Sequence, residues 1–119
     1  MKTALIAASL AALAMSTVNA QTTPTVITTK ALVSACQNSA STADQAFCHG
    51  FAQGVFDTYS MSRHPSRNPE FICFKGQSPS RKQTMTDFLA WTEKHPQYAD
   101  RSAADTLLRY LASAFPCKS

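Results

Sequence analysis

The sequence predicts a small all-α domain of about four helices, stapled by disulfides and preceded by a cleaved signal peptide. Three observations carry this prediction. An apolar stretch lies near the N-terminus, hydrophobic side chains later recur at helical spacing, and four cysteines lie in the part that would remain after cleavage. No segment shows a convincing alternation of apolar and polar residues, which a half-buried strand would require.

The N-terminus has the layout of a secretory signal peptide. A positive charge precedes an apolar run over residues 4–15, and Val18 and Ala20 supply the short side chains of a cleavage site. We therefore expect residues 1–20 to be the signal peptide, with cleavage between Ala20 and Gln21. The run is shorter than the roughly 20 apolar residues that span a bilayer, so stable membrane insertion is not expected. Export would place the mature protein in the periplasm.

The mature chain is expected to begin with a leader and a short helix. Residues 21–27 are rich in threonine and contain a proline, which predicts a disordered leader before a helical domain over residues 28–119. The first helix is expected to take Thr28 or Thr29 as its N-cap and to end near Cys36.

The second helix has the clearest pattern. Thr42 and Gln45 match a capping box, in which each side chain bonds a backbone N–H group at the start of a helix. Bulky side chains then recur every four residues, which predicts a buried row. The row comprises Phe47, Phe51, Val55 and Tyr59, flanked by Cys48, Ala52 and Phe56.

Three further residues of this helix call for an explanation. Gly50 and Gly54 each cost up to about 1 kcal/mol relative to alanine in a helix, so we expect another helix to approach closely there, with a ligand groove as the less favoured alternative. Asp57 lies among apolar neighbours in the sequence, and we expect a buried carboxylate that accepts hydrogen bonds from backbone groups.

The second half of the chain predicts a long loop and two more helices. Prolines and a glycine within residues 62–79 indicate an irregular connection. Ser80 and Gln83 match a second capping box, and Ser102 is expected to start the last helix. The third helix is expected to bury Met85, Phe88, Leu89, Trp91 and Thr92. The fourth is expected to bury Leu107, Leu108, Leu111, Ala114 and Phe115, and to end at Pro116.

The four cysteines predict two disulfides, because an even number of cysteines in a short exported chain is typical of a disulfide framework. Three pairings are conceivable. We favour Cys36 with Cys48, because an antiparallel helical hairpin brings them side by side. Cys73 and Cys117 then tie the long loop to the C-terminus. The chain has no Cys-x-x-Cys motif and no paired zinc-ligand spacing, so neither a metal nor another cofactor is predicted.

The positive charge is concentrated in one segment. The whole chain carries a formal charge of +4, and residues 60–82 alone contain five cations and one anion. We predict that Arg63, Arg67 and Lys75 contact a partner, because a basic loop can steer association with an acidic cleft. Tyr98, in the turn after the third helix, is a second candidate contact as an exposed tyrosine. Nucleic acid is not an expected partner, since export would separate the protein from it.

A set of motifs resembles the Rap/Tai immunity proteins. The segment from Cys48 to Asp57 follows their pattern Cys-x-Gly-aromatic-x-x-Gly-x-x-Asp. Further matches follow in order along residues 28–117: Cys73, His95-Pro96 and Phe115-Pro116-Cys117. The chain departs from the pattern at Phe74-Lys75, where a proline would commonly follow the loop cysteine, and its loop is unusually basic.

The resemblance implies a non-enzymatic inhibitor of the bacterial periplasm. Proteins of that family bind amidase toxins delivered by type VI secretion, block the active site, and often form homodimers. The resemblance therefore implies a peptidoglycan amidase effector as partner and a homodimer as an assembly. The sequence offers no convergent catalytic set, so no catalytic residue is predicted. An alternative function is that of a periplasmic acid-stress chaperone, which would also be small, helical and disulfide-bonded.

Overall fold

The computed structural model describes residues 25–63 and 69–118 and contains four α-helices. The helices are α1 (Thr29–Gln37), α2 (Thr42–Ser62), α3 (Arg81–Glu93) and α4 (Ala103–Ala114), with a short 3-10 helix η1 (Pro96–Tyr98) before α4. The described residues form no strand, only two isolated bridges. The prediction of a small all-α bundle is confirmed. The expected signal peptide, its cleavage site and Arg67 lie outside the described residues.

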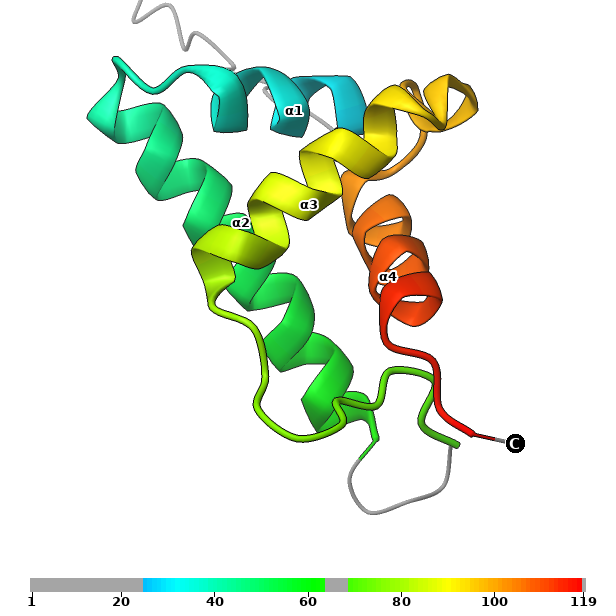
Figure 1. Ribbon diagram of the computed structural model, residues 1–119. Coiled ribbons are helices and arrows are strands. Elements are labelled where there is room, and N and C mark those ends of the chain that lie inside the picture. Colours follow the sequence, from blue (N-terminus) through cyan, green and yellow to red (C-terminus); the bar gives the residue numbers. More distant parts are fainter. Residues whose placement is uncertain (1–24, 64–68, 119) are drawn as a thin grey trace, which may run out of the picture.

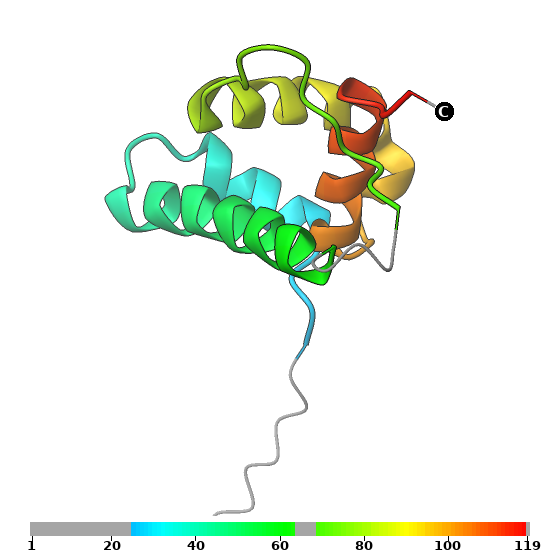
Figure 2. The same cartoon turned by 90° about the horizontal axis from the view of Figure 1, so that it is seen from below.

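The helices are arranged in two layers joined by α4. Figure 1 shows α1 and α2 meeting as a hairpin, with α3 crossing in front of α2. Seen from below in Figure 2, α1 and α2 lie on one side, α3 lies opposite, and α4 runs between them at one end. Consistent with this view, α4 contacts each of the other three helices.

Each helix begins at a hydroxyl side chain that accepts a hydrogen bond from the N–H group three residues later. The caps are Thr28, Ser41, Ser80 and Ser102. The expected capping box at Thr42 was wrong by one residue, because Ser41 caps α2. Gln45 instead donates to the carbonyl oxygens of Ala35, Cys36 and Asn38, at distances of 3.0–3.3 Å. Gln45 therefore links the start of α2 to the end of α1 and to the turn between the two helices.

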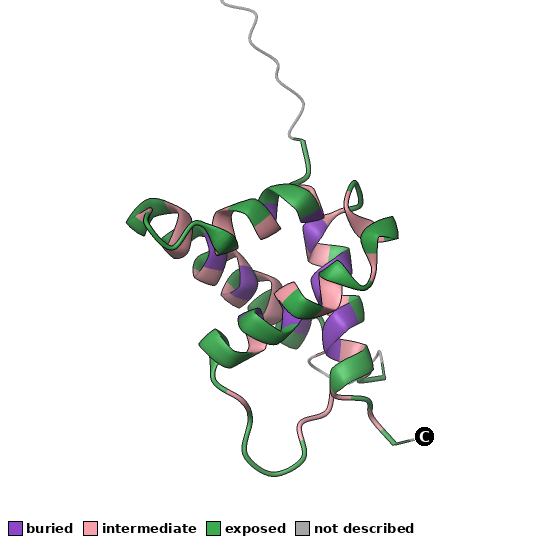
Figure 3. Ribbon diagram, turned by 45° about the horizontal axis from the view of Figure 1, so that its top comes forward, coloured by how far each residue is buried: buried purple, intermediate pink, exposed green. Residues whose placement is uncertain are grey.

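The core lies where the helices cross (Figure 3). Its buried apolar residues are Leu32, Cys48, Ala52, Tyr59, Ile72, Met85, Phe88, Ala103, Leu107, Tyr110 and Leu111. Phe88 is the largest of the fully buried side chains and packs on Tyr110, with ring centroids 5.7 Å apart. The burial of Met85 and Phe88 in α3 and of Leu107 and Leu111 in α4 agrees with the sequence prediction.

Single residues of two helices lie differently from the expectation, although both helices turn the expected face to the core. In α2, Phe47 is 41% exposed, and the buried positions are Cys48, Ala52 and Tyr59. In α4, Tyr110 is buried while Ala114 is exposed. The rest of the expected face packs on the core in both helices, with Phe51 and Val55 in α2 and Leu108 in α4 partly buried against it.

Both disulfides have the favoured pairing. Cys36 is bonded to Cys48, with Cα atoms 5.0 Å apart, and closes the hairpin of α1 and α2. Cys73 is bonded to Cys117, with Cα atoms 4.8 Å apart, and links the loop before α3 to the segment after α4. No free cysteine occurs among the described residues.

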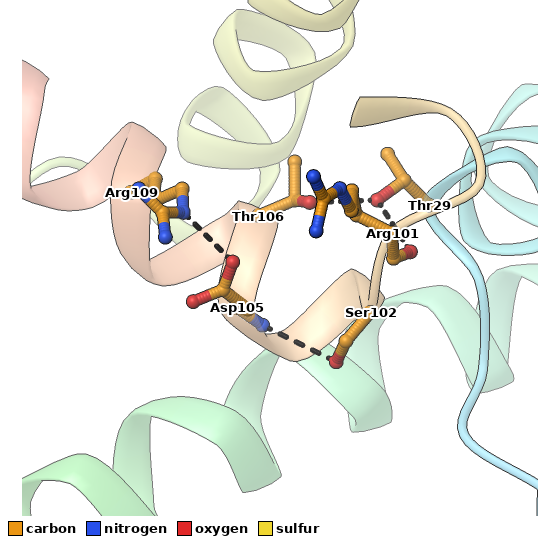
Figure 4. Close-up of polar contacts among 6 residues, drawn as sticks. All are labelled: Thr29, Arg101, Ser102, Asp105, Thr106 and Arg109. Carbon is orange, nitrogen blue, oxygen red and sulfur yellow. Dashed lines mark hydrogen bonds and ion pairs between the residues drawn. The ribbon is translucent and has the colours of Figure 1, made fainter. Parts of the chain in front are cut away.

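A buried polar joint connects the start of α1 to the start of α4 (Figure 4). The hydroxyl groups of Thr29 and Thr106 are 2.8 Å apart, and the backbone N–H of Thr29 donates to the carbonyl oxygen of Arg101 at 2.8 Å. Both threonines are almost fully buried, so this pair satisfies polar groups that would otherwise cost folding energy. Next to the joint, the ion pair with Asp105 raises the pKa of Arg109.

Candidate partner-binding surfaces

The return arm of the long loop, residues 69–74, is anchored on α2 and on the C-terminal segment. The hydroxyl of Tyr59 accepts hydrogen bonds from the backbone N–H groups of Phe71 at 3.1 Å and Ile72 at 3.0 Å. The N–H of Cys73 donates to the carbonyl oxygen of Phe115 at 2.8 Å. With the Cys73–Cys117 disulfide, these bonds fix the arm at the lower end of the bundle (Figure 1).

Arg63 serves as an internal anchor for the same arm. Its guanidinium lies 4.5 Å from the ring centroid of Phe71 and 4.9 Å from that of Tyr59, within the range of cation–π attraction. Its Nη1 donates to the carbonyl oxygen of Pro69 at 2.9 Å, and its Nε is buried without a hydrogen-bond partner among the described residues. The side chain is half-buried, so its charge is directed toward the chain itself rather than outward.

Lys75 lies in the exposed part of the loop. It precedes Gly76, whose φ of +75° places it in the left-handed region that favours glycine. Gln77 and Ser78 after this turn are also exposed. The three residues of the expected basic contact surface therefore differ in their surroundings. Lys75 is exposed to solvent, and Arg63 holds the loop in place. Arg67 lies outside the described residues.

Tyr98 belongs to an aromatic stack and is not the exposed residue that the sequence predicts. It is half-buried, its ring stacks on Trp91 with centroids 5.6 Å apart, and the Arg109 guanidinium lies 5.9 Å from its centroid. His95 stacks on the same indole at 3.9 Å, and its Nδ1 lies 2.7 Å from the carbonyl oxygen of Trp91. Stacking on Trp91 fixes Tyr98 and leaves part of its side chain at the surface.

The outer face of α2 is open, contrary to expectation. A Cβ atom added at Gly50 or Gly54 would meet nothing within 4 Å, so no helix approaches closely there. The two glycines instead line a groove of about 520 Å³, together with Leu108 of α4. Phe47 and Met61, which are 41% and 75% exposed, also belong to α2. This helix therefore carries apolar side chains outside the core.

The ionisable groups of residues 25–63 and 69–118 form no metal site, and Asp57 does not lie where the sequence predicts. Asp57, expected to be buried, is exposed and accepts a hydrogen bond from Gln53 at 2.8 Å, one helical turn away. In this part of the chain, no group of three or more His, Cys, Asp or Glu side chains is placed to hold a metal ion. None of the helices described here combines the length and hydropathy needed to cross a membrane.

Comparison with known proteins identifies the family. A family model described as Rap1a immunity proteins matches residues 28–117. The chain belongs to this family. No curated protein and no solved structure matches the chain. The Rap1a match confirms the resemblance noted in the sequence, and it runs from the cap of α1 to the last cysteine.

The Rap1a match covers every surface described above. It includes both disulfides, the loop with Lys75, the aromatic stack and the outer face of α2. Membership in an immunity family points to a role exercised by binding a toxin rather than by catalysis. Sequence patterns located the basic loop, but they left the groove of α2 as the less favoured alternative. The two glycines were the signal for it, and close helix packing was the wrong interpretation of them.

Proposed function

We propose that this protein is an exported periplasmic immunity protein that binds a type VI secretion amidase effector and occludes its active site. The observation that carries the proposal is the match to Rap1a immunity proteins over residues 28–117. Family membership favours this role over that of an acid-stress chaperone. The protein would act as a steric inhibitor and would need neither a cofactor nor a catalytic residue.

The anchored loop supports the proposed mode of binding. Tyr59, Arg63 and the Cys73–Cys117 disulfide restrain the loop before any partner arrives. A restrained loop loses less conformational entropy on association than a free one, so more of the contact energy appears as affinity. The exposed cation Lys75 would raise the rate of encounter with an effector whose cleft is acidic.

This proposal predicts that basic side chains of the loop contribute to affinity. The Arg67→Ala/Lys75→Ala double variant should bind the effector about tenfold more weakly at low ionic strength, because exposed charge pairs each contribute up to about 1 kcal/mol. The difference should shrink as salt is added. Calorimetry with a cysteine amidase encoded by a neighbouring gene would measure both effects.

A matched control is the Lys94→Ala/Arg101→Ala double variant, which removes the same charge at exposed positions outside the loop. It should bind within about twofold of the wild type. Equal affinity of the loop variant and the wild type would remove the loop from the interface. A wild-type protein that neither binds nor inhibits the amidase would refute the proposed function itself.

We further propose that the protein forms a homodimer through the outer face of α2. Phe47 and Met61 each lie seven residues, or about two turns, from Gly54. An antiparallel pair of α2 helices centred on Gly54 would therefore place Phe47 of one copy beside Met61 of the other. Sedimentation should show a dimer for the wild type and for Gly54→Ala, and a monomer for Gly54→Arg. The open space at Gly54 lets the fold accept both substitutions.

A further inference from the structure

A second cavity lies on a different side of the bundle from the groove of α2. It has a volume of about 290 Å³ and is bounded by α2, α3, α4 and the loop before α3. Its apolar lining includes Ala52, Phe56, Phe74, Met85, Leu107 and Leu111. Met85, Leu107 and Leu111 are each at most 3% exposed, so the cavity reaches down to the packed core. We call it the α3 pocket.

The rim of the α3 pocket is polar and positively charged. Arg81 is the one charged residue among those that line it, with Gln53, Ser78 and Thr84 as polar neighbours. Arg81 is exposed, and neither ion pair of the described residues involves it. The pocket lining contains no carboxylate. An apolar interior with an unneutralised cation at its mouth is complementary to an apolar group attached to an anion.

The positive charges in the first turn of α3 oppose the stability of that helix. Arg81 and Lys82 occupy the first turn of the helix, and no acidic residue lies there. Cations are unfavourable at a helix N-terminus, where the helix dipole already presents positive partial charge. Folding alone therefore gives no reason for two cations in this turn. A carboxylate beside Arg81 would gain from that guanidinium and from the dipole.

The size of the pocket indicates what occupies it. Cavities that bind drug-sized molecules measure roughly 300–1,000 Å³, and the α3 pocket lies just below that range. It suits a single bulky side chain, the kind of anchor that dominates protein–protein interfaces. Phe74, which forms one wall, directly precedes Lys75 in the chain, so the pocket is continuous with the exposed part of the loop.

We propose that the α3 pocket receives a bulky apolar side chain from an acidic segment of the effector, with Arg81 pairing with a carboxylate beside that anchor. The inference rests on the proposed function, since it names the surface and the chemistry through which the partner is bound. The anchor fills the apolar interior, and the acidic flanks lie against the rim at Arg81.

Synthetic peptides test the pocket without the effector. The probe is a short peptide with one central tryptophan between glutamates. Two controls replace the tryptophan by alanine or the glutamates by lysines. Titration of the full mature chain, followed by NMR, should shift the amide signals of Ala52, Phe74 and Met85 with the probe and with neither control. No shift with the probe, or equal shifts with the alanine peptide, would overturn the proposal.

A pair of adjacent charge reversals separates the pocket from general electrostatics. Arg81→Glu should weaken binding of the probe by roughly five- to tenfold, because it replaces an attraction at the rim by a repulsion. Lys82→Glu makes the same charge change one residue away, at a side chain outside the pocket lining, and should change affinity by about twofold. Both variants place a carboxylate in the first turn of α3, where it stabilises the helix, so both should fold. Equal losses would overturn the assignment of Arg81.

The amidase assay distinguishes failure of this inference from failure of the proposed function. If the wild type inhibits the effector and Arg81→Glu inhibits it equally well, the α3 pocket is not used and the immunity function stands. If the wild type does not bind the effector, the proposed function fails, whatever the peptides do. The inference is supported when Arg81→Glu loses affinity for the probe and the effector in parallel.

Discussion

Replacing both Cys73 and Cys117 by alanine should lower the free energy of unfolding by about 4 kcal/mol. The disulfide joins residues 44 positions apart, and the chain-entropy model assigns about this stabilisation to a ring of that size. The free energy of unfolding of a domain of this length is typically only about 5–15 kcal/mol, so the variant should be only marginally stable. Urea denaturation at equilibrium measures the loss, with the slope of the transition reporting any expansion of the unfolded state.

The second disulfide provides the comparison. Cys36 and Cys48 close a ring of 12 positions, for which the same model gives about 3 kcal/mol. If ring size governs stability, the Cys73/Cys117 variant should be the less stable of the two double-alanine variants. The opposite order would show that packing around the buried Cys48 outweighs ring size. Loss of the longer ring should also weaken effector binding, because it frees one end of the anchored loop.

The features that could be predicted from sequence are those that local chemistry determines. Serine, threonine and proline mark the helix ends, which is why all four helices are predictable within a few residues. The pairing of the cysteines follows from helix order, because a hairpin and a C-terminal tail leave few geometries for two bridges. Burial of Phe88 and Leu107 also follows from spacing, since Phe88 lies three residues after Met85 and Leu107 lies four residues before Leu111, each on one helix face.

The features that could not be predicted depend on which helix packs where. Phe47 lies at one edge of the apolar stripe from Phe47 to Val55, and the spacing does not show that packing on the core begins at Cys48. Gly54 is compatible with close packing inside one chain or with an open groove. Arg63 looked like a free cation because its aromatic partner Phe71 is eight residues away in the sequence. Each of these assignments required tertiary distances.

Tyr59→Phe should destabilise the protein by about 2–4 kcal/mol, a large effect for the loss of one oxygen atom. The hydroxyl accepts hydrogen bonds from two backbone N–H groups, those of Phe71 and Ile72, and the second of these bonds is buried. A buried donor left without a partner costs about 1–3 kcal/mol. The phenyl ring of the variant keeps the contact with Phe71, whose centroid lies 4.7 Å away, so the effect isolates the hydroxyl.

Tyr59→Phe should loosen the return arm more than the rest of the protein. Amide hydrogen exchange at Ile72 and Cys73 should accelerate in Tyr59→Phe more than exchange at Phe88, because the arm opens while the helices remain packed. Tyr110→Phe is the matched control: this tyrosine is 5% exposed, burial raises its pKa, and its hydroxyl makes no hydrogen bond to the described residues. It should cost less than about 0.5 kcal/mol. Equal destabilisation by the two variants would mean that the Tyr59 hydroxyl does not hold the loop, and that the disulfide and Arg63 alone keep the arm in place.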